Sequence, residues 1–209
     1  ISVSGATHED LRRFYGVDST VVPHGVDPVF FEIGLRREPR PFFLCVSTLH
    51  PHKNLERLVR AFGSYARRDS RHTLVLAGMR GFFAERLEAV ITELGLTGRV
   101  RLTGWIPREE LLELYRTAAG IVYPSTFEGF GMPVLEAMAA GVPLACSDIE
   151  PLRGIAAGSA LLFDPTDESA IAASFESLLS QPAGRGVEAA RDYTWENAAR
   201  KTLDVLLAK

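Results

Sequence analysis

Residues 120–147 read GIVYPSTFEGFGMPVLEAMAAGVPLACS, and this stretch contains the pattern that predicts the fold. An apolar run at 120–125 is followed by a glycine-containing loop, then by a helical pattern that begins at Pro133 and ends at Gly141, and then by a second apolar run at 142–147. Short apolar runs bounded by Gly, Pro or Ser are typical of buried strands, and proline is favoured in the first turn of a helix. The stretch therefore predicts a strand, a helix and a second strand.

The same alternation continues on both sides of this stretch. Further strand-like runs lie at 41–47, 72–78, 99–104 and 160–163. Helical patterns lie at 54–66, with Asn54 as the expected N-cap, and at 107–119, with Pro107 in the first turn. Repeated alternation of strand and helix implies right-handed crossovers and a parallel sheet that is covered on both faces. We therefore predict an α/β protein with a Rossmann-like, doubly wound parallel sheet.

The two ends of the chain do not follow this alternation. Residues 1–30 are predicted to hold a strand end, a short helix and a turn-rich connector, residues 31–180 the Rossmann-like domain, and residues 181–209 a C-terminal helical extension. The flanks have no evident core of their own, although the extension has apolar side chains such as Trp195 and Leu203 to bury. The chain opens at Ile1, without an initiator Met or a signal peptide, which predicts an excised or processed piece.

The composition excludes several classes of protein. The chain has 209 residues, of which 46% are hydrophobic and 23% charged, with a net charge of −3, so it can form a packed core and is not disordered. The slightly acidic balance argues against a nucleic-acid partner. The longest apolar runs are shorter than the roughly 18–20 residues of a transmembrane segment. Cys45 and Cys146 lie inside apolar runs, which predicts buried, reduced thiols and a cytoplasmic protein.

The loop after the 120–125 run is the best candidate for a binding site. In open α/β sheets, ligands bind outside the carboxyl ends of the strands. Gly129 and Gly131 allow the backbone to approach a ligand closely, and the helix that begins at Pro133 offers free N–H groups to an anion such as phosphate. The glycines do not have the G-x-G-x-x-G order of a dinucleotide fingerprint, which disfavours NAD.

Two carboxylates and a lysine surround this loop. Glu128 precedes the glycines, and Glu136 lies in an apolar helix, where an ionised carboxylate needs a partner such as a sugar hydroxyl. The alternative is that Glu136 only compensates the helix dipole. Lys53 would lie beside the same anion site if its loop faces this one; otherwise it is an ordinary surface lysine. His50 and His52 have no third ligand nearby, so no metal site is predicted.

These residues resemble a known family. EGFGMPVLEAMAAGVPLACSD (128–148) is similar to the E-x7-E segment of retaining glycosyltransferases of family 4, the glycosyl transferases group 1, which have the two-domain GT-B fold. HPHKNLERLVRAF (50–62), RVRLTGWIPREELLELYRTA (99–118) and VVPHGVDPVFF (21–31) resemble other segments of its C-terminal, donor-binding half. VSGATHEDLRRFYGV (3–17) is similar to the segment that closes the acceptor-binding domain, the rest of which is absent from this sequence.

The resemblance implies a role for each matching residue. Glu136 would bind the ribose hydroxyls of a UDP-, GDP- or ADP-sugar, Glu128 the hydroxyls of the transferred sugar, and Lys53 the diphosphate leaving group. No metal would be needed, because Lys53 and a helix N-terminus can stabilise the leaving phosphates. The other implied contacts are Gly129, Phe130, Gly131, Met132 and Pro133 at the sugar and phosphates, and Gly78, Met79, Gly104, Trp105 and Ile106 around the base.

The sequence departs from the family pattern at the expected diphosphate site. Thr48 and His52 stand where many members have an arginine, and His24 replaces the usual asparagine of the connector. One lysine and one titratable histidine therefore remain near the diphosphate. This predicts weaker stabilisation of the leaving group, or help from Arg80 or from outside this chain.

The resemblance implies the donor-binding half of an enzyme that transfers a sugar to an acceptor glycan or lipid-linked glycan. Such an enzyme would be cytoplasmic, with an association at the inner membrane through the absent N-terminal domain. Two alternatives stay open: a non-catalytic nucleotide-sugar-binding module, and a GT-B sugar-nucleotide epimerase. The fragment alone is expected to bind the donor without transferring the sugar.

Overall fold

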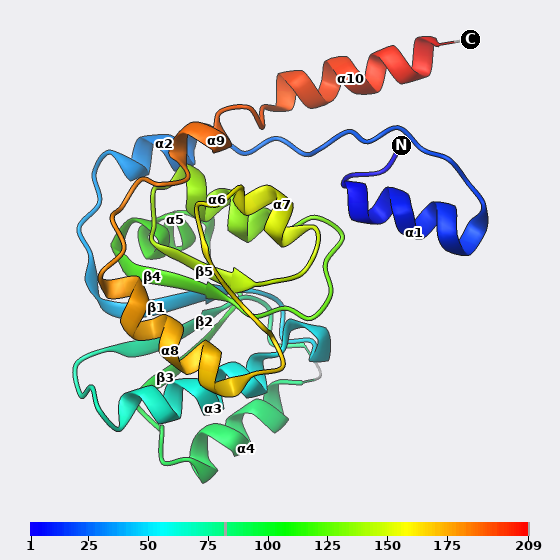
Figure 1. Ribbon diagram of the computed structural model, residues 1–209. Coiled ribbons are helices and arrows are strands. Elements are labelled where there is room, and N and C mark those ends of the chain that lie inside the picture. Colours follow the sequence, from blue (N-terminus) through cyan, green and yellow to red (C-terminus); the bar gives the residue numbers. More distant parts are fainter. Residues whose placement is uncertain (82, 209) are drawn as a thin grey trace.

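The computed structural model describes residues 1–81 and 83–208, and within them a six-stranded parallel sheet forms the centre of the molecule (Figure 1). Its strand order is β3-β2-β1-β4-β5-β6. The strands are β1 (Arg40–Val46), β2 (Thr73–Ala77), β3 (Val100–Gly104), β4 (Ala118–Tyr123), β5 (Leu144–Ser147) and β6 (Leu161–Phe163). Each predicted strand is present within a residue or two, and the Rossmann-like α/β fold is confirmed.

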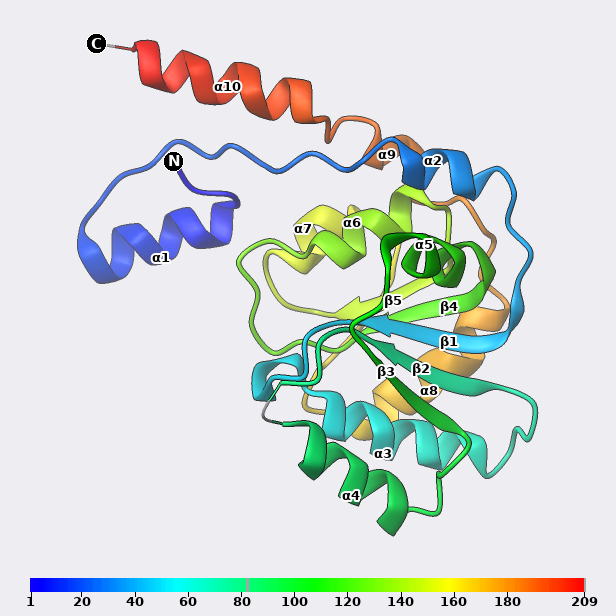
Figure 2. The same ribbon diagram turned by 180° about the vertical axis from the view of Figure 1, so that it is seen from behind.

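Helices cover both faces of the sheet (Figures 1 and 2). One face is covered by α3 (Leu55–Ala66), α4 (Ala84–Glu93) and α8 (Glu168–Leu179). The other is covered by α2 (Val29–Gly34), α5 (Arg108–Thr117), α6 (Met132–Ala139) and α7 (Leu152–Ala156). The remaining helices are α1 (Gly5–Tyr15), the 3-10 turn η1 (Pro51–Lys53), α9 (Val187–Ala190) and α10 (Trp195–Leu207).

Aromatic side chains fill the core on each side of the sheet. Phe175 of α8 packs against Phe43 of β1, with ring centroids 4.9 Å apart, and against Phe62 of α3, at 5.5 Å. On the opposite face, Phe30 of α2 meets Tyr115 of α5 edge to face at 5.1 Å. Because the central strands are buried on both faces, their sequences are continuous apolar runs rather than alternating ones.

The strand order reverses between β1 and β4, and this position determines where a ligand can bind. β1 pairs in parallel with β2 on one side and with β4 on the other. A crevice forms outside the carboxyl ends of the strands at such a switch point. The loops that follow β1 and β4 meet there: Thr126 N donates to His52 O at 2.8 Å, and Asn54 Nδ2 donates to Pro124 O at 3.0 Å.

The helices that begin near Asn54 and Pro107 differ from the prediction in detail. Asn54 is the N-cap residue of α3, as predicted, but its side chain makes no cap hydrogen bond, because its Oδ1 accepts from Arg57 Nη1 at 2.6 Å. Its amide nitrogen donates to the carbonyls of Pro124 and Pro165. The helix predicted at 107–119 is the shorter α5, with Pro107 as its N-cap residue. It ends at Thr117 because Ala118 already pairs with Arg40 as the first residue of β4.

The C-terminal part of the chain contains two helices, α9 and α10, where one helical stretch was expected. Leu203 and Leu206 of α10 are 54% and 72% exposed, so these apolar side chains are not buried within the described chain. Both cysteines are buried as predicted, and burial raises the pKa of the Cys45 thiol to about 12. Among the described helices, none has both the length and the apolar character needed to cross a bilayer.

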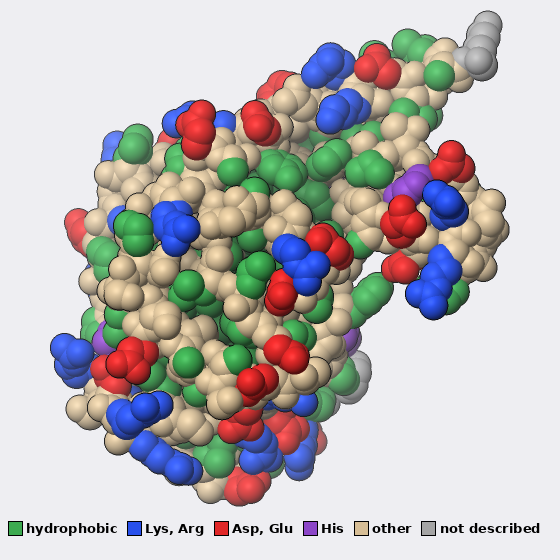
Figure 3. Space-filling view, in the orientation of Figure 1, with side chains coloured by type: hydrophobic (Ala, Val, Ile, Leu, Met, Phe, Trp, Pro, Cys, Tyr) green, Lys and Arg blue, Asp and Glu red, His purple; other side chains and the backbone are tan. Residues whose placement is uncertain are grey.

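The N-terminal segment lies beside the carboxyl edge of the sheet. A short parallel bridge joins Ser2 to Val21, and α1 lies between these two residues in the chain. Both ribbon views place α1 next to the loops that follow the strands (Figures 1 and 2). The space-filling view shows it standing out from the body, with charged side chains on the visible face (Figure 3). The division of the chain at residues 30 and 180 stays a prediction.

Candidate functional site

A cavity of about 400 Å³ lies at the carboxyl ends of β1, β2 and β4. It contains most of the residues that the sequence singled out. The predicted site residues that line it are Thr48, Lys53, Gly78, Met79, Glu128, Phe130, Gly131, Met132 and Pro133. His24 of the connector and Tyr123 at the end of β4 also line it. The Lys53 loop and the glycine loop therefore face each other across this cavity.

Lys53, Tyr123 and Glu128 form a hydrogen-bonded group in this cavity. Lys53 Nζ lies 2.6 Å from Glu128 Oε1 and donates a second hydrogen bond to Tyr123 Oη at 3.1 Å. Tyr123 Oη donates to the same Glu128 oxygen at 2.7 Å. The Lys53 and Glu128 side chains are only 14% and 10% exposed, so this is a largely buried ion pair. Lys53 is therefore not an ordinary surface lysine.

The phenol of Tyr123 stays protonated in this setting. Burial, followed by the charge of Glu128, raises its pKa well above the usual tyrosine value. The hydroxyl can therefore accept from Lys53 and donate to Glu128 at the same time. Tyr123 was not among the sequence-predicted site residues. A hydroxyl at the end of the otherwise apolar strand run at 120–125 is the signal that could have found it.

Glu136 lies beyond the first turn of α6, and its partner is a tyrosine. Tyr115 Oη donates to Glu136 Oε2 at 2.6 Å, and Tyr115 itself is fully buried. Burial raises the pKa of Glu136, while the Tyr115 hydrogen bond and the charge of Arg108 act in the opposite direction. The first turn of α6 holds no acidic residue, so compensation of the helix dipole does not account for this carboxylate.

Two positions around the cavity require glycine, Gly78 through both its φ and a backbone contact and Gly131 mainly through its φ. A Cβ on Gly78, which has φ of 148°, would lie 2.1 Å from Ser47 O. A Cβ on Gly131, which has φ of 116°, would lie 2.4 Å from a methyl carbon of Leu152. Gly129 has more room, because the nearest atom to its added Cβ is Thr7 Oγ1, at 3.9 Å. The chain itself thus demands glycine at 78 and 131, but not at 129.

Residues from the N-terminal segment contact the glycine loop. Ser4 Oγ and Thr7 Oγ1 donate to the Gly129 carbonyl oxygen at 2.7 and 3.1 Å. The His24 ring packs edge to face on Phe130, with centroids 5.0 Å apart. No local pattern predicts these hydroxyl contacts, because Ser4 and Thr7 lie more than 120 positions from Gly129 in the chain.

His52 and Arg80, which were expected to assist Lys53 at the diphosphate, do not add positive charge to the cavity. Partial burial, followed by the charge of Lys53, lowers the pKa of His52, which favours the neutral form of its ring. The His52 carbonyl, rather than its ring, holds the loop that follows β4. Arg80 forms an ion pair with Glu88 and is not one of the residues lining the cavity. Within the described residues, Lys53 is the one lysine or arginine that lines it.

The remaining predicted residues lie outside the cavity lining. Trp105 is 73% exposed just after β3, and Ile106 packs partly against the core. Gly129, His52 and Glu136 also do not line the cavity. Gly129 and His52 are next in sequence to residues that line it, and Glu136 lies one turn along α6 from Met132, which lines it. The contacts implied for Trp105 and Ile106 with a nucleotide base stay predictions.

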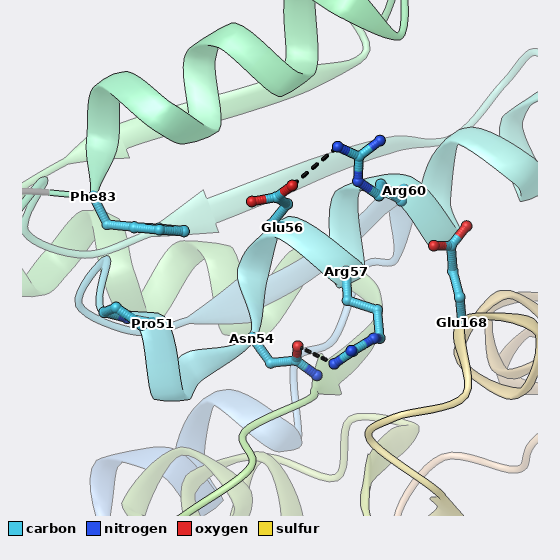
Figure 4. Close-up of a pocket in the computed structure, with 7 residues that line it drawn as sticks. All are labelled: Pro51, Asn54, Glu56, Arg57, Arg60, Phe83 and Glu168. Atoms are coloured by element: carbon cyan, nitrogen blue, oxygen red, sulfur yellow. Dashed lines mark hydrogen bonds and ion pairs between the residues drawn. The ribbon is translucent and has the colours of Figure 1, made fainter.

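A second hollow of about 380 Å³ lies along α3, but its polar groups bind one another (Figure 4). Arg57 donates to Asn54 Oδ1 at 2.6 Å, and Arg60 forms an ion pair with Glu56 at 2.9 Å. None of the sequence-predicted site residues lines this hollow. In the part of the chain that the structure describes, no group of three or more His, Cys, Asp or Glu is arranged to hold a metal ion.

The fold and this cavity define a Rossmann-like domain of the kind found in GT-B glycosyltransferases. Residues 27–202 match the family of glycosyl transferases group 1, and the chain belongs to this family. It is similar to the O-antigen chain mannosyltransferase B of Escherichia coli, with 34% identity over 78% of this chain and 45% of that protein. It is also similar to glycogen synthase of Mycobacterium tuberculosis strain H37Rv, with 30% identity over 100% of this chain and 53% of that protein.

Solved structures agree with this assignment. The sucrose-phosphate synthase of Thermosynechococcus elongatus superposes with a TM-score of 0.83 at 26% identity, covering 98% of this chain and 56% of that one. The chain thus spans about half the length of the relatives it matches. The fold and the family are shared along nearly the whole chain.

Proposed function

We propose that this chain is the C-terminal, donor-binding half of a family 4 retaining glycosyltransferase. The whole enzyme transfers a sugar from a nucleoside-diphosphate sugar to an acceptor glycan or lipid-linked glycan held by an N-terminal domain. The observation that carries this proposal is the cavity at the strand-order reversal, where Lys53, Glu128 and the start of α6 lie together. The alternatives, a non-catalytic module and an epimerase, are not favoured by any specific contact.

The proposed roles follow from the chemistry of the cavity. The diphosphate lies between Lys53 and the N–H groups at the start of α6. The Lys53 ammonium and the positive end of the helix dipole both favour an anion there. The transferred sugar lies at Glu128, and the ribose hydroxyls donate to Glu136. As the glycosidic bond to the phosphate breaks, negative charge grows on the leaving diphosphate, and fixed donors lower that barrier without a metal.

The relatives guide the choice of sugar. Since a relative with 34% identity is named as an O-antigen chain mannosyltransferase, we propose mannose as the transferred sugar. The product would then be a bacterial-type surface polysaccharide, assembled at the cytoplasmic side of the inner membrane. The membrane association would belong to the N-terminal domain.

A thermal-shift panel tests the proposal. UDP, GDP, ADP, UDP-glucose, GDP-mannose and ADP-glucose are each added to the 209-residue chain. A ligand present at about 100 times its Kd adds about 2.7 kcal/mol of stability, which is a clear rise in Tm. We expect one base to stabilise the chain and GDP-mannose to give the largest shift. If no ligand raises the Tm of this chain, and none raises the Tm of the longer enzyme, the proposal is wrong.

Sugar-nucleotide binding is expected to weaken as the pH falls. Glu136 must be ionised to accept from the ribose hydroxyls, and burial raises its pKa above the ordinary value of 4.5. Protonation below that raised pKa removes the acceptor charge, so affinity is full above it and lost below it. Titration calorimetry with a sugar nucleotide across pH checks this, since its diphosphate has no monoester proton that titrates near neutrality. A Glu136→Gln variant should lack the transition.

A further inference from the structure

Two buried tyrosines repeat the spacing of the two carboxylates. Tyr115 and Tyr123 are eight positions apart, as are Glu128 and Glu136. Each tyrosine hydroxyl donates to one carboxylate: Tyr115 to Glu136 at 2.6 Å and Tyr123 to Glu128 at 2.7 Å. Tyr115 is fully buried and Tyr123 is 2% exposed. Both carboxylates are therefore held from the core side.

We propose that Tyr115 and Tyr123 are positioning residues that orient Glu136 and Glu128 toward the donor, the first for the nucleoside and the second for the sugar. This inference rests on the proposed function. Tyr115 binds Oε2 of Glu136, and Tyr123 binds Oε1 of Glu128. In the described residues, the other oxygen of each carboxylate has no protein hydrogen-bond partner and is free to accept from a ligand.

The Tyr115 contact fixes an acceptor in an otherwise apolar helix. Val134, Leu135 and Ala137 around Glu136 are all fully buried and offer the carboxylate no polar group. The Tyr115 ring is held in turn by Phe30 of α2. The charged groups near Glu136 are Arg108, at the start of α5, and Asp27 of the connector, which form an ion pair with each other. Loss of the Tyr115 hydroxyl would leave Glu136 with no direct side-chain donor among the residues that the structure describes.

Tyr123 forms hydrogen bonds with both Glu128 and Lys53. Its hydroxyl accepts from Lys53 while donating to Glu128, so it remains a donor to Glu128 when Lys53 turns to the diphosphate. A nucleoside diphosphate without a sugar has no hydroxyl that reaches Glu128. The Tyr123 contact should therefore matter more for a sugar nucleotide than for the free nucleotide.

The test compares Tyr115→Phe and Tyr123→Phe in the whole 209-residue chain. The binding of UDP, GDP, ADP and the matching UDP-glucose, GDP-mannose and ADP-glucose is measured by calorimetry. A hydrogen bond to a charged group is worth roughly tenfold in affinity. Tyr115→Phe should weaken the free nucleotide and its sugar ester alike, by about tenfold, and move the pH transition of sugar-nucleotide binding to higher pH. Tyr123→Phe should weaken only the sugar ester by a similar factor.

Tyr65→Phe is the matched control, because Tyr65 is a buried tyrosine whose hydroxyl bonds to His72, away from the cavity. It should change neither affinity nor the pH transition. Equal effects of all three variants would indicate general loosening of the core and overturn the proposal. Normal binding and an unmoved pH transition in Tyr115→Phe would also overturn it, while leaving the proposed function intact. Failure of all six ligands to bind both the wild-type chain and the longer enzyme would overturn both.

Discussion

Replacement of Glu136 by alanine is expected to abolish nucleotide binding while the chain stays folded. Two charge-assisted hydrogen bonds to ribose hydroxyls contribute at least about 3 kcal/mol, so the affinity should fall by roughly 100-fold or more. Isothermal titration with the nucleotide that wild-type chain binds measures this directly. Glu188→Ala is a suitable control, because its side chain is 94% exposed at α9 and makes only a surface ion pair with Arg191.

The isosteric Glu136→Gln variant separates binding from stability. Because burial raises the folded-state pKa of Glu136, ionisation of this carboxylate at neutral pH opposes folding, and that cost is absent below its unfolded pKa. Glutamine removes the cost and can still accept from Tyr115. We therefore expect a Tm equal to or above that of wild type at neutral pH, together with strongly weakened binding. Unchanged nucleotide affinity in both variants would contradict the role proposed for Glu136.

Lys53→Met is expected to lower both diphosphate affinity and stability. The variant removes the one lysine or arginine that lines the cavity among the described residues, so nucleotide affinity should fall by about 100-fold. It also leaves the nearly buried Glu128 carboxylate without its charged partner, which costs about 3 kcal/mol. Denaturant unfolding and titration calorimetry measure the two losses separately.

The double variant Lys53→Met/Glu128→Gln distinguishes these two effects. Removal of both charges leaves no unpaired buried charge, so most of the lost stability should return, whereas nucleotide binding should not. Arg67→Met, on the exposed end of α3, is the control for loss of a cation elsewhere. A double variant as unstable as Lys53→Met would show that the Lys53–Glu128 pair is not the source of the stability loss.

The fold could be predicted because its sequence signals are local. The runs at 41–47 and 120–125 are mostly apolar and do not alternate with polar residues, since their strands are buried on both faces. Glycines and prolines mark the ends of several helices. Element ends were less predictable where a tertiary contact intervened. Ala118 continues a helical pattern in sequence, yet its pairing with Arg40 makes it the start of β4.

Much of the candidate site was also predictable, because Lys53 and Glu128 follow strands that are adjacent at the switch point. The partners of the carboxylates were not. Tyr115 and Tyr123 lie on apolar faces, where periodicity alone identifies them as core residues, and only the folded chain shows their hydroxyls reaching Glu136 and Glu128. The position of the Arg80 side chain was equally unpredictable, because its ion-pair partner Glu88 is brought near by the folded position of α4.

The hydroxyl contacts of Ser4 and Thr7 have a practical consequence for protein engineering. The family match begins at residue 27, which makes that position an inviting point at which to shorten the chain. A chain trimmed there would lose both side-chain donors to the Gly129 carbonyl, together with the His24 ring that covers Phe130. The boundary of the family is therefore not the boundary of the site, and the first 26 residues belong in any version used to study ligand binding.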